Sequence, residues 1–148
     1  MNVILDKRII SIAKDTVITV KEDTLGTKIA EIFETKEVHH LPVINDVNEA
    51  IGIISLGDYR QLQHHFTRFN LEKSIEENHK LLNSLLAKEI MTPDPVCLEI
   101  NDSLGDAIDI FIQNKIHSII ICKDKKVQFI LTPVDILKYV VEPALLQK

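Results

Sequence analysis

The feature that most constrains this chain is a duplicated segment in which an apolar strand runs directly into a helix. The first copy is Gly52 to Ser55 followed by Asp58, and the second is Phe129 to Leu131 followed by Thr132 and Asp135. In each copy the hydroxyl can cap the new helix, and the carboxylate lies in the positive field of its N-terminus. Polyol and phosphate ligands bind at such corners. Two equivalent corners therefore predict two matched pockets, although a capping role alone would give the same pattern.

The segments around the two corners also repeat in the same order. The first half predicts a strand over 16–20, a helix capped by Asp23-Thr24, and a hairpin of strands over 38–44 and 50–54. The second half predicts strands over 96–100 and 116–122, with a turn over 124–126. Helical spacing places two apolar sets on the core faces of the intervening helices: Leu25, Ile29, Ile32 and Phe33, then Leu104, Ile108, Phe111 and Ile112.

This duplication predicts a domain organisation of two repeats, 9–66 and 89–141, joined by a helical connector over 67–88. Terminal segments cover 1–8 and 142–148, and the opening residues Ile4 to Ile12 are expected to pack on the second repeat. Within the connector, Ser74 to Glu77 forms a capping-box pattern. An apolar stripe, predicted to join the core or a dimer interface, consists of Ile75, Leu81, Leu82, Leu85 and Leu86.

Composition narrows the class of protein. The 148 residues carry a formal net charge of −5, and the 17 Lys and Arg residues are scattered, which argues against nucleic-acid binding. No apolar run reaches the ~18 residues of a membrane span, and the charged start Met1 to Arg8 does not fit a signal peptide. Cys97 and Cys122 lie in apolar runs and predict free thiols in a reducing, cytoplasmic compartment.

The order and spacing of four motifs resemble the CBS domain, the small module named after cystathionine β-synthase and usually found in tandem as a Bateman module. The motifs are Val38 to Val43, Gly52 to Asp58, Glu89 to Pro93 and Thr132 to Asp135. The resemblance implies an α/β fold of two β-α-β-β-α repeats packed with pseudo-two-fold symmetry. It also implies a non-catalytic, homodimeric sensor. Since no effector domain is fused to it, we expect a protein effector to act in trans or the dimer itself to be the switch.

In such a sensor the regulatory ligand is AMP, ADP, ATP or S-adenosylmethionine, bound in clefts between the repeats. Asp58 and Asp135 would accept the ribose hydroxyls, beside Ser55 and Thr132. The first site would combine Ser55 and Asp58 with Asp94, Pro95, Val96, Cys97, Ile116, His117, Ser118 and Ile119. The second site would combine Thr132 and Asp135 with Asp15, Thr16, Val17, Ile18, Val38, His39, His40 and Leu41.

The second repeat departs from the family pattern, and this leaves an alternative open. Phe129 stands where the pattern has glycine, and Ile119 to Ile121 stand where it has Leu-Pro-Val. Glycine permits close approach of the backbone, so a phenylalanine could crowd or close a pocket. The first repeat also has Ile12-Ala13 in place of the lead-in Met91-Thr92. The alternative function is therefore a structural or dimerisation module with closed clefts.

Other polar residues carry weaker hypotheses. Among the strand histidines, His39, His40 and His117 could meet ligand phosphates and make binding pH-dependent, and His40 is the favoured one. Arg60 and Lys138 follow the two aspartates and could also meet phosphates. The histidines His64, His65 and His79, together with the His39-His40 pair, suggest a metal sensor. No Cys or carboxylate spacing completes a zinc site, so no metal is expected. No catalytic motif is present, and the chain is predicted not to be an enzyme.

Overall fold

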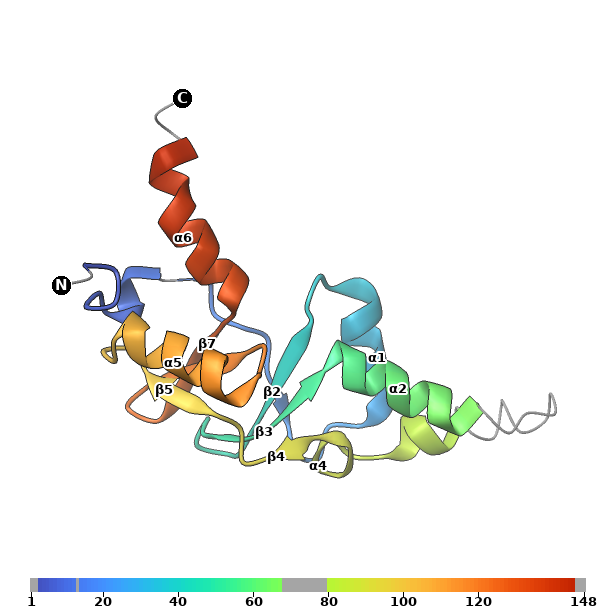
Figure 1. Ribbon diagram of the computed structural model, residues 1–148. Coiled ribbons are helices and arrows are strands. Elements are labelled where there is room, and N and C mark those ends of the chain that lie inside the picture. Colours follow the sequence, from blue (N-terminus) through green and yellow to red (C-terminus); the bar gives the residue numbers. More distant parts are fainter. Residues whose placement is uncertain (1–2, 13, 68–79, 146–148) are drawn as a thin grey trace. The chain divides into compact units, whose positions relative to one another are not determined.

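Each compact unit of the protein combines parts of both sequence repeats. The computed structural model describes residues 3–12, 14–67 and 80–145. One unit is Ile18–Pro95, and the other joins Met1–Val17 to Val96–Lys148. The lead-in to the first repeat thus belongs with the second repeat, and the lead-in to the second repeat belongs with the first (Figure 1).

The unit of residues 18–95 contains a four-stranded sheet of order β1-β2-β3-β4. Strand β1 pairs parallel to β2, and β3 pairs antiparallel to both β2 and β4. Helices α1 and α2 share one hydrophobic core with β2, β3 and Leu82 of the connector; the core includes Ile29, Leu41, Ile54 and Tyr59. The elements are β1 (Val20–Lys21), α1 (Gly26–Thr35), β2 (His40–Ile44), β3 (Ala50–Ser55), α2 (Leu56–Thr67), α4 (Ala87–Ile90) and β4 (Thr92–Pro93).

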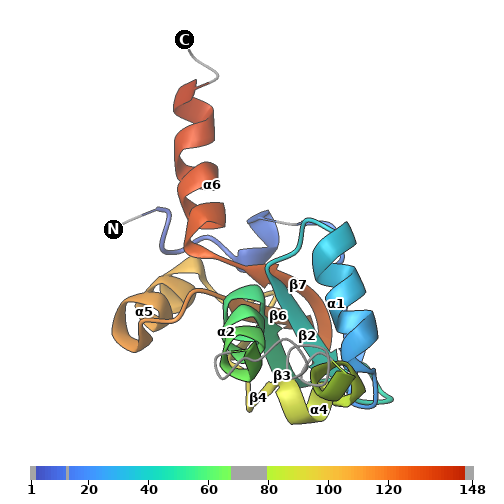
Figure 2. The same ribbon diagram turned by 90° about the vertical axis from the view of Figure 1, so that its right-hand side faces the viewer.

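The other unit has a three-stranded sheet of order β5-β6-β7, parallel between β5 and β6 and antiparallel between β6 and β7. Helix α6 leaves the end of β7, and the N-terminal segment lies beside it (Figures 1 and 2). Ile9 is fully buried in this unit's core, which confirms that the opening residues pack on the second repeat. The elements are η1 (Ile9–Ile12), β5 (Cys97–Glu99), α5 (Leu104–Asn114), β6 (Ile119–Lys123), β7 (Lys126–Leu131) and α6 (Pro133–Leu145).

Two glycines let the exchanged segments cross the starts of the helices. The amide of Gly26 donates to the carbonyl of Leu85 at 2.8 Å, and a Cβ on Gly26 would overlap the carbonyl oxygen of Leu82. The equivalent Gly105 donates to the carbonyl of Leu5 at 3.0 Å, and a Cβ there would lie 3.1 Å from that oxygen. The repeated Leu-Gly pair of the sequence therefore marks the point where the segment that leads into the other repeat packs on the helix start.

The structure corrects the predicted start of the first repeat. The strand expected over 16–20 shortens to β1, because Val17 instead donates its amide to Gln128 of β7 at 3.1 Å. The predicted cap at Asp23-Thr24 is wrong. Thr24 accepts a hydrogen bond from the amide of Lys21 at 3.0 Å, and Leu25 occupies the N-cap position of α1 without a side-chain bond.

Two predicted core positions are also wrong. Leu25 is 49% exposed because it precedes the helix, and Ile112 is 72% exposed. Eight residues at about 100° each rotate Ile112 by about 80° from Leu104, which takes it off the buried face. In the connector, Leu82 lies in the core while Leu81 is half exposed; Ser74 to Glu77 lie outside the described residues. Within the described ranges, no helix is both long enough and apolar enough to cross a bilayer.

Candidate ligand-binding site

The first corner joins β3 to α2. The Ser55 side chain accepts a hydrogen bond from the amide of Asp58 at 3.0 Å, so the predicted cap is confirmed. Asp58 is exposed in the first turn of α2. His40 pairs with Ser55 across β2 and β3, and the carbonyl of His39 accepts from the amide of Leu56 at 2.8 Å. Both histidines thus adjoin the first corner within their unit, although the sequence assigned them to the second site.

The second corner joins β7 to α6 and is more tightly bonded. The amide and the hydroxyl of Thr132 donate to Oδ2 of Asp135 at 2.8 and 2.9 Å. In return, the amide of Asp135 donates to the Thr132 hydroxyl at 3.3 Å. This reciprocal arrangement is a capping box that holds the carboxylate in one orientation.

A lysine that sequence reasoning missed completes this corner. Nζ of Lys14 donates to Oδ2 of Asp135 at 2.8 Å and to the carbonyl of Ile130 at 3.0 Å. Burial alone raises the pKa of Asp135, but the hydrogen bonds from Lys14 and Thr132 outweigh it and hold that pKa below its ordinary value. The site therefore presents a charged carboxylate that is already paired.

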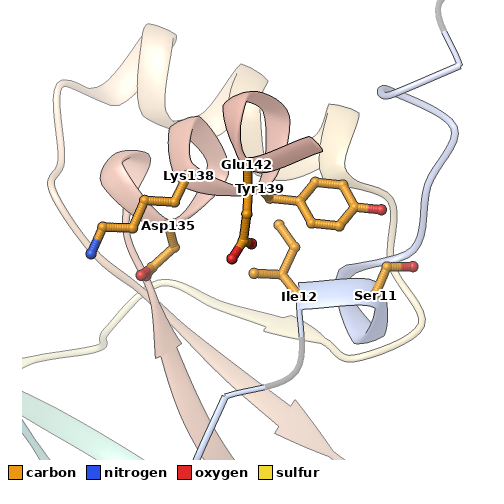
Figure 3. A pocket seen from close by; sticks show the side chains of 6 residues that line it. All are labelled: Ser11, Ile12, Asp135, Lys138, Tyr139 and Glu142. Atoms are coloured by element: carbon orange, nitrogen blue, oxygen red, sulfur yellow. The ribbon is translucent and has the colours of Figure 1, made fainter. Parts of the chain in front are cut away.

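A pocket of about 260 Å³ opens beside Asp135, between η1 and α6. In Figure 3 the side chains of Asp135 and Lys138 lie side by side, and the Glu142 carboxylate lies near Ile12. The pocket is lined by Ser11, Ile12, Asp135, Lys138, Tyr139 and Glu142. The α6 members share one helical face, at i, i+3, i+4 and i+7. Helical spacing from Asp135 could have predicted Tyr139 and Glu142, whereas no local sequence pattern indicated Ser11 or Ile12.

Phe129, which was expected to crowd or close the second pocket, lies in the core of its own unit. Phe129 is 3% exposed and packs in the hydrophobic core, and Ile119 to Ile121 are fully buried. In the first repeat, Gly52 serves a packing need instead, because a Cβ there would lie 2.7 Å from Cγ of Met91. The effect of this departure from glycine on the cleft stays a prediction. Lys14, rather than Phe129, stands next to its carboxylate.

The other predicted site residues are divided between the units. Asp94 and Pro95 follow β4, which pairs with β3 in the unit of the first corner. Asp15, Thr16 and Val17 lie in the unit of the second corner. Leu41 and Ile119 are fully buried, so only their backbone could reach a ligand. The remaining partly buried or exposed members are Ile18, Val38, Val96, Ile116, His117 and Ser118. The clefts that would unite these sets stay a prediction.

The remaining candidate residues of the sequence analysis are cysteines and histidines. Cys97 is exposed and Cys122 is buried, and the two form no disulfide with each other. A hydrogen bond with Cys122 lowers the pKa of Cys97. In the part of the chain that the structure describes, no group of three His, Cys, Asp or Glu residues could hold a metal ion. His79, one of the histidines behind the metal hypothesis, lies outside that part.

Two α/β units, each with a hydroxyl and a carboxylate at a strand-to-helix corner, define a tandem-repeat α/β protein. The chain belongs to the CBS domain family, whose sequence profile matches residues 9–65 and 87–142. An inosine-5'-monophosphate dehydrogenase from Methanocaldococcus jannaschii is 27% identical over 128 residues, which are 86% of this chain. The chain spans only 22% of that enzyme's length.

Solved structures show the same fold. The CBS domain of a CBS-domain-containing membrane protein from Sphaerobacter thermophilus superposes with a TM-score of 0.76 at 24% identity, covering 91% of this chain and 88% of that one. CBSX2, a CBS-pair protein of Arabidopsis thaliana, in its complex with AMP gives a TM-score of 0.72 at 20% identity, covering 93% and 98%.

Proposed function

We propose that this protein is a non-catalytic regulatory module that binds an adenosine-containing ligand, AMP, ADP, ATP or S-adenosylmethionine, at its two corners. The observation that carries the proposal is the fixed carboxylate of Asp135. Its Oδ2 accepts three hydrogen bonds, while Oδ1 has no hydrogen-bond partner among the described residues. Two vicinal ribose hydroxyls need an oriented carboxylate of this kind as their acceptor. The AMP complex of CBSX2 supports the same ligand class.

The first corner supports the proposal through its accessibility. Asp58 is exposed beside the Ser55 cap, and Arg60 is exposed two positions further along α2. An anionic phosphate would gain from the N-terminus of α2 and from such a cation. A ligand that bridges both repeats would shift their arrangement only by its differential affinity for the two states. That shift would be the signal passed to a protein effector.

The same proposal includes a homodimer in the cytoplasm. Val134, Leu137 and Val141 lie at i, i+3 and i+7 on α6 and are 55%, 62% and 45% exposed. An apolar helix face of this kind suits self-association. The apolar stripe of the connector fits a dimer interface less well than the sequence suggested, because Leu82 lies in the core. Cys97 and Cys122 are not joined in a disulfide, which fits a reducing compartment.

A second candidate function, an interaction module that binds no nucleotide, is favoured by one observation. Nζ of Lys14 already pairs with Oδ2 of the Asp135 carboxylate at 2.8 Å. If this pairing is permanent, the second corner has a purely structural role. The two functions predict different responses to adenosyl compounds.

Thermal melting of the purified protein with AMP, ADP, ATP, S-adenosylmethionine or NAD at millimolar concentration tests the proposal. A ligand at ~100 times its dissociation constant adds ~2.7 kcal/mol, which raises the melting temperature by several degrees. We expect Asp58→Ala or Asp135→Ala to reduce this increase. Asp46→Ala removes a fully exposed carboxylate in a turn and serves as the control. If no compound changes the melting temperature, the interaction module becomes the better description.

A further inference from the structure

The ammonium of Lys14 occupies hydrogen-bonding capacity that a ribose would need. Oδ2 of Asp135 accepts from the amide and hydroxyl of Thr132 and from Lys14, all within 2.9 Å. A carboxylate has about four lone-pair positions on its two oxygens. Three donors on one oxygen leave it no room for a further hydroxyl. A ligand that uses both oxygens must therefore remove one of these donors.

Of the three donors, Lys14 is the one that can leave without breaking the corner. The two Thr132 groups belong to the capping box at the start of α6. The Lys14 side chain is 38% exposed, and its other bond goes to the carbonyl of Ile130 on β7. Rotation of this side chain frees Oδ2 and leaves the backbone hydrogen bonds of the corner intact.

The first corner lacks this cation. Aligning the two lead-ins, Ile12-Ala13-Lys14-Asp15 with Met91-Thr92-Pro93-Asp94, places Pro93 at the position of Lys14. Pro93 belongs to β4, where it pairs with Gly52, and it carries no charge. Asp58 makes no ion pair among the described residues, which include both lead-ins apart from Ala13. The chain thus contains one corner with a tethered cation and one without.

We propose that Lys14 is a specificity-determining residue that competes with the ribose for Asp135, so that adenosyl ligands fill the Asp58 corner first and the Asp135 corner more weakly. This inference rests on the proposed ligand class. The competition comes from an internal group, so its strength depends on neither the phosphates nor the adenine of the ligand. It also ties occupancy of the second corner to release of residue 14 from β7.

Calorimetric titration with AMP tests the inference in the Asp58→Ala background, where only the second corner is left. We expect the double variant Asp58→Ala, Lys14→Met to bind AMP about tenfold more tightly than Asp58→Ala alone. In the double variant the charge-assisted hydrogen bond from Lys14 to Asp135 no longer has to be broken. Lys14→Gln, which keeps a polar end, should change the affinity in the same direction. Lys28→Met is the matched control, because Lys28 pairs with Glu31 on the exposed face of α1.

Each alternative result has a distinct meaning. If the wild type binds AMP but neither Lys14 variant binds it more tightly, the inference is overturned and the proposed function still stands. A weaker affinity would show that Lys14 holds the phosphate. If neither the wild type nor any variant binds AMP while circular dichroism shows native folding, the proposed AMP site and the competition both fall.

Discussion

Replacing Lys14 with methionine should lower the stability of the ligand-free protein even though it opens the second corner. The side chain loses two hydrogen bonds, one of 2.8 Å to Asp135 and one of 3.0 Å to Ile130. A charge-assisted bond contributes about 1.5–3 kcal/mol when shielded from water. Here the Lys14 side chain is 38% exposed, so solvent reduces this value, and Thr132 still holds the carboxylate. We expect a loss of about 1 kcal/mol at pH 7.

The pH dependence of this loss identifies its cause. Asp135 has a pKa below its ordinary value of 3.8 in the folded protein, so its contribution to stability is present above that value. The contribution is lost as the pH falls through the folded pKa. The difference in the free energy of unfolding between wild type and Lys14→Met should therefore stay constant between about pH 5 and 7 and shrink below about pH 4. Lys138 and Glu142 line the same pocket and are unchanged in both proteins.

Urea unfolding at several pH values measures this difference. With a slope of about 2 kcal/mol per molar urea, the midpoint at pH 7 should fall by about 0.5 M. Lys28→Met should change it much less, because the side chains of Lys28 and Glu31 are 58% and 59% exposed. An unchanged midpoint in Lys14→Met at pH 7, or a difference that is equally large at pH 3, would refute the reasoning.

Two further predictions concern packing and assembly. Gly26→Ala should lower the free energy of unfolding by about 2 kcal/mol, because the added Cβ would overlap the backbone of Leu82. Gly57→Ala should raise it by up to about 1 kcal/mol, because Gly57 in α2 has open space around it. Urea unfolding measures both changes. Leu137→Asp should convert a dimer into monomers in analytical ultracentrifugation without lowering the melting temperature of the monomer, and a wild type that sediments as a monomer would contradict the dimer.

The sequence predicted those features that depend on neighbours along the chain. The caps at Ser55 and Thr132 were predicted correctly because a hydroxyl and the amide three residues later meet in any helix start. The duplication predicted the α/β class and the order of elements. The errors at Leu25 and Ile112 occurred at the ends of helix faces, where one residue of shift changes the side that a side chain faces.

Tertiary structure decided what stands beside each corner. Lys14 and Asp135 are 121 positions apart, and no local pattern relates them. The exchange of lead-ins between the repeats brings the lysine to β7, and packing within the same unit places Phe129 in the core. A periodic pattern reports which face of an element is apolar, but not which distant segment covers its edge. The sequence therefore determined the two corners, whereas only the fold decided that the Lys14 ammonium pairs with the carboxylate of one of them.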